Sequence, residues 1–85
     1  MDFRQAWDRV AELAGETFRT GRGVEFSYRF KRTFIVTEPA GQSIPRTNFE
    51  KVFKRRSAVA TSGTPVQGQA FIEAVFNDNR FEPTP

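Results

Sequence analysis

Hydrophobic residues in segment 2–14 recur at intervals of three and four, the spacing that places side chains on one face of an α-helix. Charged residues occupy the opposite side of this helix. Asp2 can cap the first turn with Gln5 as the reciprocal partner of a capping box, and Gly15 suits the C-terminal end. The pattern predicts an N-terminal helix whose apolar face consists of Phe3, Ala6, Trp7, Val10, Leu13 and Ala14.

Alternation of apolar and polar residues replaces the helical spacing in segment 24–30 and predicts a β-strand there. The strand's apolar face would consist of Val24, Phe26, Tyr28 and Phe30. Segment 16–20 alternates more weakly and could form a further short strand with Phe18 pointing inward.

Segment 33–37 is rich in β-branched and aromatic residues and predicts another strand, with Phe34 and Val36 expected to point inward. A tight turn near Lys31 and Arg32 would join it to the preceding strand as an antiparallel hairpin. The chain from Glu38 to Pro45 is interpreted as a loop because of its glycine and proline residues.

The sequence Thr47-Asn48-Phe49-Glu50 fits a capping box and predicts a second helix over residues 48–56. Its apolar face would consist of Phe49, Val52 and Phe53. Small and polar residues then indicate a loop over 57–65. Residues 67–77 predict a third helix that is apolar nearly all round, which is typical of a helix at the centre of a core, and Asn77-Asp78-Asn79 ends it.

The order helix, two or three strands, helix, helix predicts an α+β fold. We expect a small antiparallel sheet covered by the N-terminal helix and helix 67–77, with helix 48–56 at the edge and its basic face outward. Residues 1–82 would form one domain, because 85 residues leave no room for two cores, and residues 83–85 a frayed tail.

The chain contains no cysteine and no histidine. Their absence excludes a disulfide framework, a zinc finger, a cysteine nucleophile and a Ser-His-Asp triad. The few acidic residues show no spacing typical of a catalytic or metal site, so we expect neither an enzyme nor a cofactor. No segment has the length of a transmembrane span, and an acidic N-terminal segment is unlike a signal peptide, which favours a cytoplasmic location.

Five blocks of the sequence resemble a loose group of small bacterial and mobile-element proteins with no assigned activity. The blocks cover residues 15–20, 26–28, 44–51, 68–74 and 78–81. Phe53 and Phe76 depart from the group, which has smaller or aliphatic residues at these positions. The resemblance spans nearly the whole chain and implies a single compact domain, but it transfers no site residues.

Local clusters of positive charge give the sharpest functional signal, although the net charge of the whole chain is only +3. Residues 46–56 hold five basic residues and one acidic residue, and a second basic cluster lies at the predicted hairpin tip. A basic helix beside a basic hairpin could bind a phosphate backbone by releasing counterions. The predicted nucleic-acid-binding residues are Arg29, Lys31, Arg32, Lys51, Lys54 and Arg55.

Two familiar nucleic-acid motifs are excluded. Residues 22–28 lack the aromatic residue at Val24 and the small residue at Glu25 that an RNA-recognition strand requires. Helices 48–56 and 67–77 are too far apart in the chain for a helix-turn-helix. The alternative to nucleic-acid binding is a protein–protein module, with homodimerisation through a free sheet edge or an apolar patch.

Overall fold

The capping box predicted at the N-terminus is present in the computed structural model, which describes residues 2–56 and 66–81. Asp2 Oδ1 accepts a hydrogen bond from the amide of Gln5 at 2.9 Å, and the amide of Asp2 donates to Gln5 Oε1 at 3.0 Å. Helix α1 (Phe3–Glu12) follows and buries Ala6, Trp7 and Val10. The predicted helix is therefore confirmed, although it ends two residues earlier than expected.

Among the described residues, four antiparallel strands form one sheet in the order β1-β2-β3-β4. They are β1 (Phe18–Arg19), β2 (Glu25–Phe30), β3 (Phe34–Glu38) and β4 (Ser43–Pro45). The predicted α+β class is confirmed, but the sheet has one strand more than the two or three expected. Strand β4 lies in a segment interpreted as a loop; it is three residues long with one buried side chain, too short to show alternation.

The inward face of β3 is the opposite of the predicted one. Ile35 and Thr37 are fully buried, whereas Phe34 and Val36 are half-buried on the outer face. The reason is the hairpin register, in which Ile35 lies opposite the inward residue Phe30. Directly opposed residues of an antiparallel pair share a face, so the even-numbered inward residues of β2 require odd-numbered inward residues in β3.

Val24 is also not inward, because it precedes β2 in the loop after β1 and is 54% exposed. Phe18, Phe26 and Tyr28 are buried as predicted. The hydroxyl of Tyr28 donates a 2.6 Å hydrogen bond to the carbonyl of Val10, in the last turn of α1. This bond joins the centre of the sheet to the helix layer.

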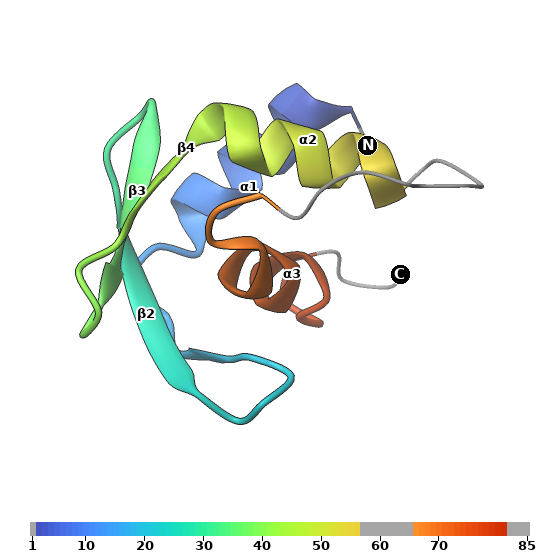
Figure 1. Cartoon of the computed structure of the whole chain (residues 1–85). Helices are drawn as coiled ribbons and strands as arrows, with labels where there is room; N and C mark the ends of the chain where they lie inside the picture. The colour runs from blue at the N-terminus through green and yellow to red at the C-terminus, as the bar shows by residue number, and fades with distance from the viewer. Residues whose placement is uncertain (1, 57–65, 82–85) are drawn as a thin grey trace.

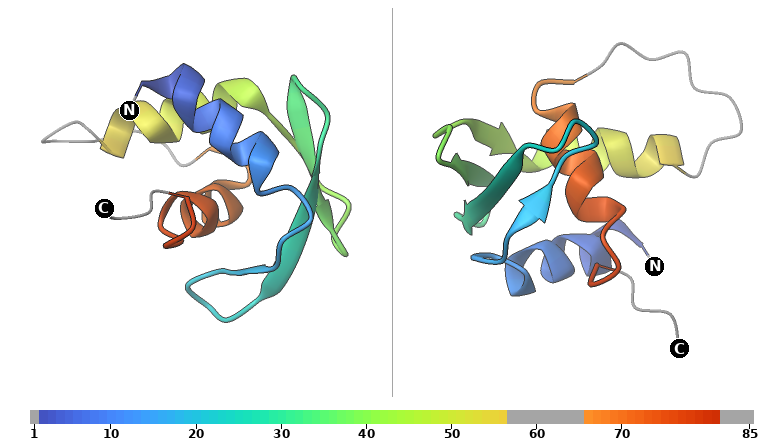
Figure 2. Two further views of the ribbon diagram at one scale, coloured as in Figure 1. Left: turned by 180° about the vertical axis from the view of Figure 1, so that it is seen from behind. Right: turned by 90° about the horizontal axis from the view of Figure 1, so that it is seen from below.

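All three helices lie on one side of the sheet, and the other face is bare in each view of the described residues (Figures 1 and 2). Helix α2 (Arg46–Arg56) begins directly after β4 with no residue between them. Thr47 therefore lies inside the helix, and the prediction that it precedes the first turn is wrong. The chain passes from β4 directly into the first turn of α2, without a loop that ends in a capping residue.

Helix α2 lies closer to the core than predicted. Phe49 is fully buried, and its ring centroid lies 5.2 Å from that of Trp7 and 5.9 Å from that of Phe76. Helix α3 (Gln69–Phe76) buries Ile72, Val75 and Phe76, which confirms its predicted central position, and it ends at Asn77.

None of the helices within residues 2–56 and 66–81 has the length and apolar character that a membrane crossing requires. The loop predicted over 57–65 and the tail predicted over 83–85 lie outside the described residues.

Candidate functional site

The tip of the β2–β3 hairpin is fixed to two helices by backbone contacts. The carbonyl of Arg32 accepts a 2.8 Å hydrogen bond from Trp7 Nε1 of α1, and the carbonyl of Thr33 accepts a 2.9 Å bond from the amide of Arg46, the first residue of α2. Arg32 has a φ of 69°, in the left-handed region that few residues other than glycine adopt. The backbone of the hairpin tip is therefore held beside α1 and α2, and the side chains of Lys31 and Arg32 are exposed.

The outward face of α2 carries Lys51 and Lys54, because Phe49 and Val52 occupy its inward face. Lys54 Nζ lies 3.7 Å from Glu50 Oε2, one turn earlier, but 73% of the lysine side chain remains exposed. Such an exposed pair contributes little to stability, so the charge of Lys54 stays available to a ligand.

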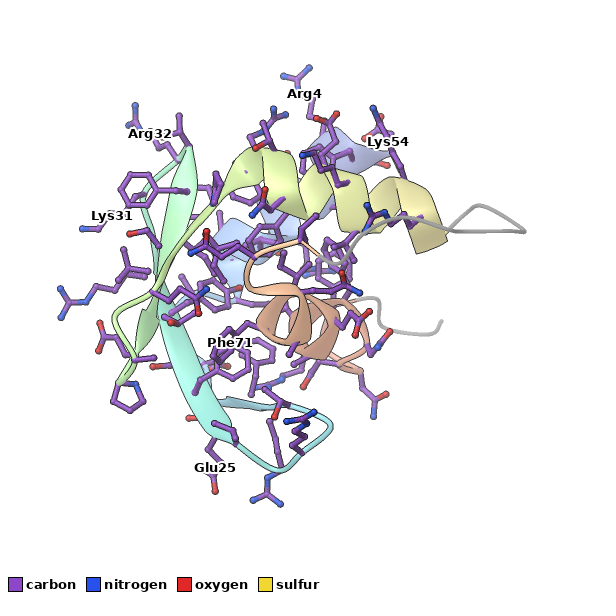
Figure 3. All side chains as sticks on the ribbon, viewed as in Figure 1. Arg4, Glu25, Lys31, Arg32, Lys54 and Phe71 are labelled. Atoms are coloured by element: carbon purple, nitrogen blue, oxygen red, sulfur yellow. The ribbon has the colours of Figure 1, made fainter. Side chains whose placement is uncertain are left out.

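Two further cations adjoin this face through contacts between helices. The guanidinium of Arg46 lies 5.0 Å above the ring of Phe3, whose centroid is 5.6 Å from that of Phe53 in α2. These contacts place the first turn of α1, with the exposed Arg4, against α2. Figure 3 shows that Arg4, Arg32 and Lys54 project from the same side of the molecule, away from α3. We define the basic surface as Arg4, Lys31, Arg32, Arg46, Lys51 and Lys54.

One predicted site residue, Arg29, lies apart from the basic surface, and another, Arg55, lies at its edge. Arg29 points from the outer face of the sheet and forms an ion pair with Glu38, across the hairpin. Arg55 lies one turn after Lys51 and about 40° from it around α2. It is half-buried and lies between Lys51 and Asn48, whose side chain donates to the carbonyl of Gln67 before α3.

The basic surface has few acids close to it in the chain. They are Glu50, which pairs with Lys54, Asp8, one turn after Arg4 in α1, and Asp2, the N-cap of α1. Among the described residues, no carboxylate forms an ion pair with Arg4, Lys31, Arg32, Arg46 or Lys51. The positive charge of the surface is therefore largely uncompensated.

A groove of about 690 Å³ lies between the β1–β2 loop and α3. Val24 and the half-buried Phe71 contribute apolar area to its lining. Arg22 on the loop and Glu73 on the helix give its two sides opposite charges. This groove is formed by different elements from those of the basic surface.

The ionisable groups with shifted pKa values have structural partners. Burial raises the pKa of Tyr28, whose hydroxyl proton is donated to the carbonyl of Val10. Asp78, which lines the groove, accepts hydrogen bonds from Arg80, and these lower the pKa of its carboxyl. Asp78 is thus an ion-paired carboxylate rather than a base poised near neutral pH. Within the described ranges, no three acidic side chains gather closely enough to hold a metal ion.

Comparisons of the chain with known protein families, with characterised proteins and with solved structures found no match.

Proposed function

We propose that the protein is a non-enzymatic module that binds nucleic acid through the basic surface. The observation that carries the proposal is the meeting of cations from three separate parts of the chain, namely α1, the hairpin tip and α2. The fold brings these cations together, although they are far apart in the sequence. Six cations with three nearby carboxylates form a surface suited to a polyanion.

The dimensions of the surface suit a nucleic-acid backbone. Arg46 and Lys54 are separated by eight residues of α2, or about 12 Å along the helix axis. A strand of duplex DNA carries one phosphate per about 3.4 Å of its axis, so the helix alone spans three or four phosphates. The hairpin tip extends the surface beyond the first residue of α2. A cytoplasmic location accords with a partner of this kind.

Salt dependence of binding tests the proposal. If all six cations neutralise phosphates, the affinity for a duplex of mixed sequence should fall about 10³-fold between 50 and 200 mM salt. The double variant Lys51→Gln/Lys54→Gln should bind more weakly and lower the slope of log K against log salt by about 2.

The matched control is Arg22→Gln, which removes an exposed arginine from the β1–β2 loop, away from the basic surface. Its slope should equal that of the unmodified protein. Fluorescence anisotropy with labelled DNA and RNA measures all three proteins. Absence of binding at 50 mM salt, or an equal loss in the Arg22 variant, would contradict the proposal.

The groove supports a second candidate function, homodimerisation. Val24 is the one large apolar side chain among the described residues that is mainly exposed, and it lines the groove. In a twofold dimer, Arg22 of one copy could face Glu73 of the other, since a self-complementary interface pairs each residue reciprocally. Light scattering should then give a mass that rises with concentration, and Val24→Lys should abolish the rise. A monomeric mass at every concentration would remove this candidate.

A further inference from the structure

Phe34 differs from every other aromatic residue of the chain. Each of the others has a ring centroid within about 6 Å of another aromatic ring. Phe34 has no such neighbour among the described residues, and it does not pack against the hydrophobic core. It is half-buried on the outer face of β3, which none of the described helices covers (Figure 1).

The surroundings of Phe34 combine apolar area with positive charge. Pro45 lies opposite it in β4, and Val36 is the next residue on the same face. Lys31 is joined to Phe34 by a 2.9 Å hydrogen bond from its amide to the Phe34 carbonyl. The side chain of Lys31 points to the side of the sheet away from the helices (Figure 3). The hairpin tip is therefore the corner at which the outer sheet face meets the basic surface.

This arrangement favours one kind of occupant. A flat apolar ring beside a cation without an acidic partner complements a base attached to a phosphate backbone. In a duplex the bases are stacked on one another and cannot reach the ring, whereas the bases of a single strand can turn outward. An aromatic ring accepts any base, because every base has a π face.

We propose that Phe34 stacks against one base of a single-stranded nucleic acid whose backbone passes over Lys31 and along the basic surface. This inference rests on the proposed function and adds to it the class of ligand. It assigns the bare sheet face a role and predicts a preference for single strands over duplexes without a preference for sequence.

The experiment compares a labelled 12-nucleotide oligothymidine with a 12-base-pair duplex by anisotropy at 50 mM salt. Phe34→Leu keeps apolar cover on β3 but removes the ring, so it should weaken single-strand binding about 5- to 150-fold and leave duplex binding unchanged. Val36→Ala, on the same strand and face, is the matched control and should change neither. Phe34→Trp should keep the affinity, and its emission should be quenched by the oligothymidine.

The outcomes separate the two proposals. If neither polymer binds, the proposed function fails and this inference fails with it. If both polymers bind and Phe34→Leu changes neither affinity, base stacking is overturned while backbone binding stands. An equal loss on both polymers shows that the ring acts only on the structure of the hairpin, which also overturns the inference.

Discussion

Replacing Arg32 with glycine should make the protein more stable and weaken its binding at the same time. Arg32 holds a φ of 69° at the hairpin tip, and its backbone carbonyl, which a glycine retains, accepts the hydrogen bond from Trp7. The left-handed conformation costs a residue with a side chain about 1–2 kcal/mol. Glycine removes this cost but adds about 0.5–1 kcal/mol of conformational entropy to the unfolded chain.

The net gain in the free energy of unfolding is therefore about 0–1.5 kcal/mol. For a domain of this size, the middle of this range corresponds to a rise of roughly 3–6 °C in Tm. The guanidinium is lost in the same substitution, so the slope of log K against log salt should fall by about 0.9. A strained backbone would thus be retained at a position whose side chain serves binding.

Thermal unfolding followed by circular dichroism measures the first effect, and a salt titration with labelled nucleic acid measures the second. Arg32→Lys is the control, because it keeps both the charge and the strain and should change neither quantity by much. A lower Tm in the glycine variant would refute the reasoning about strain. A higher Tm with an unchanged slope of log K against log salt would show that the Arg32 side chain does not contribute to binding.

Three further predictions concern stability and are measured by urea unfolding. Tyr28→Phe leaves the buried carbonyl of Val10 without its donor and should lower the free energy of unfolding by about 1–3 kcal/mol. Because burial raises the pKa of Tyr28, the unmodified protein should also lose stability as the pH rises above about 10, and the Phe variant should lack this loss. The pKa of Asp78 is lowered by hydrogen bonds from Arg80, so this pair stabilises the fold above about pH 4; the contribution should vanish at lower pH and be absent in Asp78→Asn. Gly68→Ala should cost about 2 kcal/mol or more, because φ is +77° there and a Cβ would lie 2.5 Å from a side-chain atom of β4; equal stability would contradict this account.

Local signals in the sequence were sufficient to predict α1, α3 and the existence of the first three strands. The capping box of α1 joins residues three apart, and hydrophobic spacing defines each helix without reference to the rest of the chain. The inward face of β3 required the register of the hairpin, since a shift by one residue reverses the face. Strand β4 is defined by its pairing with β3. It buries only Ile44, and a single buried residue gives no alternation of apolar and polar positions by which the sequence could reveal a strand.

The site was predictable to the extent that its residues are neighbours in the chain. Lys51 and Lys54 lie on one helix face, and Lys31 and Arg32 are adjacent at the hairpin tip. Both pairs could therefore be predicted from clusters of basic residues in the sequence. Arg4 and Arg46 join them only through contacts between helices. The basic run that contains Arg46 was the available signal for it, whereas nothing in the sequence marked Arg4.

The direct passage from β4 into α2 has a consequence for changes in chain length. Pro45 is the last residue of the strand and Arg46 the first of the helix, so the rotation of α2 about its axis is set by the strand. One inserted residue would turn the remainder of the helix by about 100° and carry Phe49 out of the core. We expect insertions to be tolerated at the β3–β4 turn and to destabilise the fold at this junction. The pairing register of β4 with β3 therefore also determines the direction in which the lysine side chains of α2 point.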